Sequence, residues 1–170
     1  VNDRVKESLS KCGIEKPDGK ITLFIVDKTK LDIEAKRIHA GGNLKGLTLT
    51  KFRTVAKGDV SKTTFEHRIM VLFGLPHVEC EAVLAHEYMH VWLNERFIEG
   101  SLGTIEGFCN LGSAALLKLE TSKLSSILMN NMLNNPNPVY GDGYRRMASH
   151  LNQIGWSRLL AEMRARTKKK

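Results

Sequence analysis

The chain has 170 residues, of which 42% are hydrophobic and 26% are charged, a composition typical of one soluble globular domain. No apolar run approaches the roughly 20 residues that a membrane-spanning helix needs, and no secretory signal is seen. The net charge of +8 would suit a nucleic-acid binder, but the basic excess lies in the first half and the carboxy-terminal tail, while the middle is acidic. Nucleic acid is therefore a disfavoured partner, and no membrane association is expected.

The cysteines indicate a cellular location for the protein, and the first residue suggests that the chain is part of a longer one. Cys12, Cys80 and Cys109 are widely spaced and form no CxxC pair. We therefore expect reduced thiols and a cytoplasmic, intracellular location. Because the chain begins with valine rather than methionine, we expect a fragment of a longer protein that folds as one domain over residues 1–170.

The first half of the chain is predicted to form a short helix, three strands and an ambiguous segment that could be a helix. These cover residues 1–10, then 21–26, 44–53 and 67–73, and finally 30–38. The first strand is a nearly continuous run rich in β-branched residues, which is typical of a buried strand. The second alternates, with Leu47 and Leu49 on one face and Thr48 and Thr50 on the other, as in a strand exposed on one side.

The second half is predicted to be helical, over residues 79–97, 104–119, 123–133 and 144–163. The first of these helices is apolar on most faces and is expected to run through the core. Gly141-Asp142-Gly143 is interpreted as a tight turn, and Gly155 as an interruption of the last helix. Strands followed by helices predict an α+β domain, with a small sheet that has an exposed edge strand and packs on the apolar helix.

The segment His86-Glu87-Tyr88-Met89-His90 carries the chemistry. Residues four apart lie on one face of a helix, so His86 and His90 can share one zinc ion. Glu87 lies at the edge of that face, where it can act as general base on a water without being a ligand. Three polar side chains on an apolar helix would be costly to bury unpaired, and a metal would satisfy them. The alternative is a surface helix with scattered histidine and glutamate.

A catalytic zinc needs a third protein ligand and an open fourth position. Glu106, near the start of the next apolar helix, is the best candidate among the acids that follow the motif, and Gly107 beside it would allow a close approach to the motif helix. Two histidines and one glutamate form the ligand set of the thermolysin-like zinc peptidases. Asn110, one turn later, either orients a ligand histidine through its amide or is an ordinary helix residue.

Several segments around these residues resemble one known family. Residues 74–76 (Gly-Leu-Pro), 82–93, 106–109 (Glu-Gly-Phe-Cys) and 140–145 (Tyr-Gly-Asp-Gly-Tyr-Arg) resemble the peptidase domain of the plant LIM-domain peptidases that limit organ size. The resemblance also includes residues 21–32 and 46–55, so it extends over most of the chain.

The resemblance implies a zincin-like, gluzincin-type metallopeptidase domain. Family members are zinc-dependent endopeptidases, activated by ubiquitin, that cleave regulators of growth and protein turnover. The match implies one zinc per chain, held by His86, His90 and Glu106, with Glu87 as the catalytic residue. LIM modules and ubiquitin-interacting segments lie upstream of the peptidase domain in the family and are absent here, so ubiquitin would act through regions outside this chain.

Other residues leave alternatives open. Tyr140, Tyr144 or Arg145 could point into the cleft and stabilise an oxyanion, or the glycine-rich segment could be simply a turn. His150 could lie on a helix that closes over the cleft. A protein substrate could extend along the strand at 44–53 and add to its edge. The competing function is a catalytically silent, zinc-bearing scaffold that binds proteins, against which the intact Glu87 argues.

Overall fold

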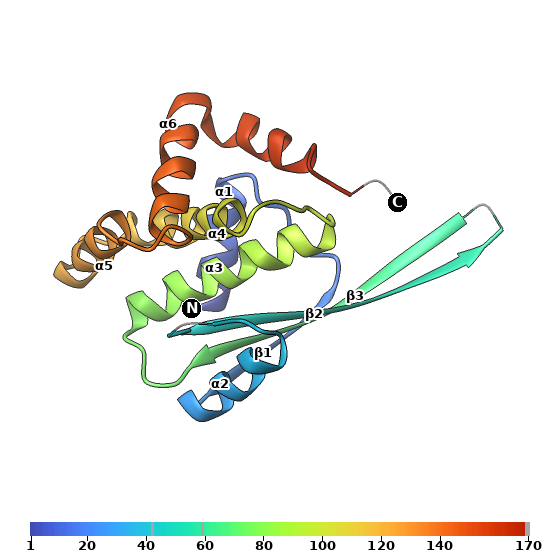
Figure 1. Cartoon of the computed structure of the whole chain (residues 1–170), viewed down its shortest axis with the longest axis horizontal. Coiled ribbons are helices and arrows are strands. Elements are labelled where there is room, and N and C mark those ends of the chain that lie inside the picture. The colour runs from blue at the N-terminus through green and yellow to red at the C-terminus, as the bar shows by residue number, and fades with distance from the viewer. Residues whose placement is uncertain (42, 59, 169–170) are drawn as a thin grey trace.

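The structure, a computed structural model, describes residues 1–41, 43–58 and 60–168, so the last two lysines of the basic tail lie outside it. Over this range the chain forms a three-stranded sheet and six helices (Figure 1). They are α1 (Asn2–Lys11), β1 (Lys20–Val26), α2 (Lys28–Arg37), β2 (Gly46–Lys57), β3 (Val60–Leu72), α3 (His77–Glu95), α4 (Leu102–Leu117), α5 (Lys123–Leu133) and α6 (Gly141–Arg164). This confirms the predicted α+β class.

The sheet has the order β1-β3-β2 and is mixed. β1 pairs with β3 in parallel, and β2 pairs with β3 antiparallel, with Thr48 opposite Ile69. β2 and β3 continue past the end of β1 as a two-stranded hairpin that projects from the rest of the molecule (Figure 1). Because β2 has a strand partner on one side only, its other edge is the exposed edge that the sequence predicted.

The two faces of the sheet are covered by different helices, α3 on one side and α2 on the other (Figure 1). Alternation along β3 explains this, because neighbouring side chains point to opposite faces. Ile69 and Val71 belong to the main core with α3, while Met70 packs with Leu47 and with Leu31 of α2 in a smaller cluster. Thr48 and Thr50 of β2 therefore face α3, and Leu47 and Leu49 face α2, so the predicted alternation holds but the threonines do not form an exposed face.

The prediction that β1 is a buried strand is wrong. Most of its side chains are exposed, and Ile25 is 63% accessible. β1 lies at the sheet edge, and α2 packs mainly against β2 and β3, with only Val26 of β1 joining the cluster around Leu31. A β-branched apolar run therefore marked a strand correctly but did not reveal its place in the sheet.

The helix α3 runs through the core, as predicted. Between β3 and α3 lies Gly74, whose φ is +85°. Pro76 directly precedes the first turn of α3. Trp92 of α3 and Phe108 of α4 are almost fully buried and their ring centroids are 5.6 Å apart. Because α3 is packed on several sides, its polar side chains are held in fixed positions.

The tight turn predicted at Gly141-Asp142-Gly143 is also wrong, because these residues form the first turn of α6. The glycines serve close packing: a Cβ on Gly143 would lie 2.3 Å from the carbonyl oxygen of Gly103 in α4. Gly107 likewise approaches Gly143 of α6, not α3 as expected from the sequence. Gly155 does break the last helix, with φ at +74°, as predicted (Figure 1).

Within the described residues, no helix combines the length and the apolar character that crossing a membrane requires.

Candidate metal centre

His86 and His90 project from one face of α3, one turn apart. Their Nε2 atoms are 3.1 Å from each other, so both rings aim at the same point. The side chains are 15% and 21% exposed, which leaves the point accessible from one side. The i, i+4 spacing on a well-packed helix thus produces the first two converging nitrogen atoms.

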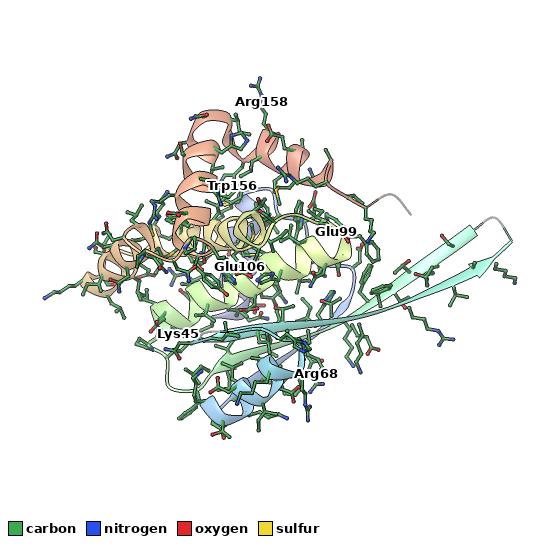
Figure 2. The ribbon with its side chains drawn as sticks, in the orientation of Figure 1. Lys45, Arg68, Glu99, Glu106, Trp156 and Arg158 are labelled. Carbon is green, nitrogen blue, oxygen red and sulfur yellow. The ribbon has the colours of Figure 1, made fainter. Side chains whose placement is uncertain are left out.

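Glu106 comes from the second turn of α4 and completes the group. Ser101 begins this helix, with its side-chain oxygen accepting a hydrogen bond from the backbone N–H of Thr104. The carboxylate oxygens of Glu106 lie 3.2 Å from Nε2 of His86 and 3.7 Å from Nε2 of His90. Figure 2 shows Glu106 next to α3, near the middle of the helical part of the molecule.

These distances fit a tetrahedral zinc site. With zinc–ligand bonds of about 2.0–2.1 Å, two ligands of a tetrahedron are separated by roughly 3.3 Å. The separation of 3.1 Å between the two nitrogens, and those of 3.2 and 3.7 Å from them to the two carboxylate oxygens of Glu106, lie close to that value. The three residues therefore fit zinc in number, in chemistry and in spacing.

The charges in the group favour a carboxylate facing two histidines. Burial by itself raises the pKa of Glu106, but hydrogen bonds and charge interactions with His86 and His90 outweigh it and lower the pKa to about 2. For His90, burial lowers the pKa, but the hydrogen bond to Glu106 and the charges of Glu87 and Glu106 raise it overall. Glu106 is thus an anion at neutral pH, as a metal ligand must be.

Cys109 is a second neighbour of the histidines that sequence reasoning did not connect with them. Its sulfur lies within 4.8 Å of ligand nitrogens of His86 and His90. The thiol is fully buried, and burial, together with the charges of Glu106 and Glu87, raises its pKa well above the ordinary value. Glu106 lies 3.2 Å from Nε2 of His86 and is already ionised, which makes it the better third ligand, and the sulfur of Cys109 is close enough to be a further one.

Asn110 supports the site from α4. Its Oδ1 lies 3.0 Å from Nδ1 of His86, and its amide nitrogen donates to the carbonyl oxygen of Tyr140. An Asn oxygen accepts, so Nδ1 of His86 carries the proton and Nε2 presents its lone pair to the metal point. Tyr140 thereby fixes the amide orientation of Asn110, which in turn fixes the tautomer of His86.

Glu87 lies beside the histidines and is 5% exposed. Its Oε2 accepts a hydrogen bond of 2.7 Å from Oγ1 of Thr48 on β2. Gly46 lies two residues before Thr48 on β2 and leaves room for the Glu87 carboxylate, because a Cβ on Gly46 would lie 2.5 Å from Oε1 of Glu87. The edge strand thus holds the carboxylate in place. Sequence reasoning did not identify Thr48, since strand alternation does not show which face of the strand meets α3.

The other candidates are dispersed. Tyr140 lines the cleft that contains His86, and burial together with the charges of Glu106 and Glu87 raises its pKa. Tyr144 is buried in the core. Arg145 donates to the carbonyl oxygen of Leu133 and pairs with Asp142, which ties the loop after α5 to the start of α6.

His150 is also separate from the metal point. Its Nε2 lies 2.6 Å from a carboxylate oxygen of Glu162, within α6. It lines a different surface hollow, together with Arg145, Arg146, Ser149 and Gln153. The structure therefore brings together His86, Glu87, His90, Glu106, Asn110 and Tyr140, and leaves the remaining candidates outside.

A cleft of about 510 Å³ opens at this site. It is bordered by the first half of α3, by α4 and α5, and by the segments before β2 and before α6. A smaller cavity of about 230 Å³ lies between α1 and Tyr88, with no ligand residue in its walls. The larger cleft is thus the one at which a molecule could reach the metal point.

Comparison with known proteins agrees with the sequence resemblance. A family model described as DA1-like (Protein DA1) matches residues 58–122. Protein DA1 of Arabidopsis thaliana is 24% identical over 155 residues, which covers 73% of this chain and 28% of that protein. The LIM domain-containing protein HDR3 of Oryza sativa subsp. japonica is 26% identical over 133 residues, covering 56% of this chain and 26% of that protein.

The chain spans about a quarter of the length of these curated relatives. No solved structure matches. The segment matched by the family model contains the HExxH motif, Glu106 and Asn110. The family model and the two relatives together support a relationship of this chain to the DA1 family.

Proposed function

We propose that this chain is the catalytic domain of a zinc-dependent endopeptidase with a zincin-like active site. The observation that carries the proposal is the convergence of His86, His90 and Glu106 on one tetrahedral point, with the carboxylate of Glu87 beside it. A cleft leads to that point, so a substrate could reach it. The similarity to the DA1 family supports the same conclusion.

The chemistry follows from the positions of the residues. A zinc ion held by His86, His90 and Glu106 would supply Lewis-acid chemistry, polarising a peptide carbonyl and lowering the pKa of water toward about 7. Glu87 accepts a proton from the attacking water as a carbon–oxygen bond forms at the scissile carbonyl. Glu87 then delivers that proton to the amine nitrogen as the carbon–nitrogen bond breaks.

The substrate is proposed to lie extended along the free edge of β2. Within the described residues that strand pairs with β3 alone; its Thr48 hydrogen-bonds to Glu87, and its Gly46 leaves room for the Glu87 carboxylate. An added strand would gain main-chain hydrogen bonds and would place its backbone carbonyls next to the metal point. This arrangement suits a protein or peptide substrate better than a small molecule.

A second candidate function is a zinc-bearing binding domain without catalysis. The observation in its favour is the sulfur of Cys109 near both histidines. If Cys109 joined Glu106 as a ligand, zinc would have four protein ligands and a closed, structural site. The raised pKa of the thiol and the Thr48–Glu87 hydrogen bond favour the catalytic reading, because a structural site has no need for a positioned base.

The wider biological role rests on similarity alone. We propose that the protein acts in the cytoplasm on regulators of growth or protein turnover, as the resemblance to plant organ-size regulators implies. Ubiquitin would act through regions outside this chain.

The test combines metal analysis with proteolysis. The purified chain is loaded with zinc, its metal content is measured, and it is incubated with unfolded proteins with and without ubiquitin. Glu87→Gln serves as the control, since it keeps the side-chain volume but removes the base. We expect one zinc in both proteins and cleavage only in the unsubstituted one. Equal cleavage by Glu87→Gln would refute the role of Glu87, and full zinc binding that needs Cys109 would favour the structural site.

A further inference from the structure

The cleft extends from the metal point along α3. Five of its lining residues, Glu79, Ala82, Val83, His86 and Glu87, recur at the spacing of one helix face. With a rise of 1.5 Å per residue, the distance from His86 back to Glu79 is about 10 Å. An extended peptide advances about 3.3 Å per residue, so roughly three substrate residues fit along this stretch.

Apolar side chains form a large part of the walls of this cleft, and they lie beside polar ones, namely Asn43, Asn110, Ser113, Asn131, Asn135 and Asn137. The apolar side chains come from four separate parts of the chain: Leu44 before β2, Ala82 and Val83 of α3, Leu117 of α4, and Leu128 and Met132 of α5. Ala82 and Leu117 are buried, and Val83 and Met132 pack against the main core, so the walls are held by the fold. Leu128 and Met132, one helical turn apart, face the cleft from the side opposite α3.

Charge is confined to the two ends of the cleft. At one end are His86, one of the proposed metal ligands, and Glu87. At the other, Lys45 pairs with Glu79, and Figure 2 shows Lys45 near the amino-terminal end of α3. Among the described lining residues, no other charged side chain lies between these ends. A charged substrate side chain placed there would lose hydration without meeting a side chain of opposite charge, which is costly.

We propose that this cleft selects an apolar substrate side chain, of the size of leucine, methionine or phenylalanine, within three residues of the scissile bond. Leu128 and Met132 are the residues that determine this specificity. The role of this cleft in cleavage rests on the proposed peptidase function. Burying a side chain of that size corresponds to a preference on the order of tenfold or more over a small or charged one.

The first experiment maps cleavage sites. The zinc-loaded chain is incubated with a randomised decapeptide library, and the new termini are sequenced by mass spectrometry. We expect leucine, methionine and phenylalanine to be enriched about tenfold over aspartate and glutamate at one position near the cut. Leu128→Lys should reverse this, favouring acidic residues at that position. Ile127→Lys is the matched control, since Ile127 is the exposed neighbour on α5 outside the cleft, and should keep the apolar preference.

A binding experiment separates this inference from the proposed function. The zinc-loaded Glu87→Gln protein is titrated with the peptides acetyl-Gly-Gly-Leu-Gly-Gly-amide and acetyl-Gly-Gly-Asp-Gly-Gly-amide, followed by NMR. Tighter binding of the leucine peptide, weakened by Leu128→Lys but not by Ile127→Lys, supports the cleft even if the unsubstituted protein cleaves nothing. Cleavage without apolar enrichment, or a preference that Leu128→Lys leaves unchanged in a folded protein, overturns the inference. If neither peptide is preferred and no cleavage occurs, both proposals fail.

Discussion

Thr48 of the edge strand β2 donates a hydrogen bond of 2.7 Å to the carboxylate of Glu87 on α3. The contact links the strand that is proposed to receive the substrate with the residue that is proposed to move the proton. A base held in this way points toward the metal side of the cleft before any substrate binds, and preorganisation of this kind lowers the cost of catalysis.

Replacing Thr48 by valine should lower peptidase activity about tenfold, because Glu87 loses the donor that orients it. Zinc affinity should not change, since Thr48 touches no ligand. Steady-state cleavage of a fluorogenic peptide, together with zinc titration, checks both points. Thr48→Ser keeps the hydroxyl and should restore activity. Thr54→Val removes a hydroxyl from the exposed hairpin and should have no effect; comparable losses in both valine variants would remove Thr48 from this role.

Glu106→Gln should weaken zinc binding by at least about 100-fold, because it removes the charged ligand from a site with only two others. Competition with a chromophoric chelator measures the dissociation constant. Glu99→Gln is the matched control, since Glu99 is an exposed acid that pairs with Lys168. Cys109→Ala should leave zinc affinity nearly unchanged. A larger loss from Cys109→Ala than from Glu106→Gln would make the cysteine the third ligand.

The grouping of the proposed ligands could be predicted from sequence because much of its geometry is local. His86 and His90 share a face by helical spacing alone, and Asn110 lies one turn from Glu106 for the same reason. Thr48 and Cys109 could not be connected with the site in this way. Thr48 reaches Glu87 only because β2 packs beside α3, and such a contact between distant segments leaves no trace in the spacing of either.

The errors have physical causes as well. Glycine and aspartate at 141–143 are the residues of a tight turn, but they also suit a helix start that must pack closely on another backbone. The fold uses them in the second way. The β-branched run of β1 fits a central strand and an exposed edge equally well by composition. Which one it forms depends on how many strands and helices surround it.

Zinc affinity should fall as the pH decreases. The fall should begin at a higher pH than in a site whose histidine ligands have ordinary pKa values. A proton on Nε2 of His90 competes directly with the metal. Burial lowers the pKa of His90, but the hydrogen bond to Glu106 and the charges of Glu87 and Glu106 raise it above 6.5 overall, so the metal-free site holds its proton more tightly. Below this raised pKa, each pH unit should weaken zinc binding by about tenfold for this proton.

Chelator competition from pH 5.5 to 8.5 measures this dependence. In Glu87→Gln one of the charges that raise the pKa of His90 is removed, so the onset of weakening should shift to lower pH while the ligand set remains intact. An onset unchanged by this substitution would contradict the proposed interaction between Glu87 and His90.

Gly143→Ala should destabilise the fold by about 1–3 kcal/mol and weaken zinc binding at the same time. The added methyl group would lie 2.3 Å from the carbonyl oxygen of Gly103, so α6 must move away from α4. That shift would disturb Tyr140, whose carbonyl accepts the hydrogen bond from Asn110 that orients His86. Urea unfolding and zinc titration measure the two effects. Gly100→Ala is the control, because its methyl group would meet neighbours only at 3.6 Å. Loss of stability without loss of zinc affinity would show that the metal site does not depend on the close approach of α4 and α6.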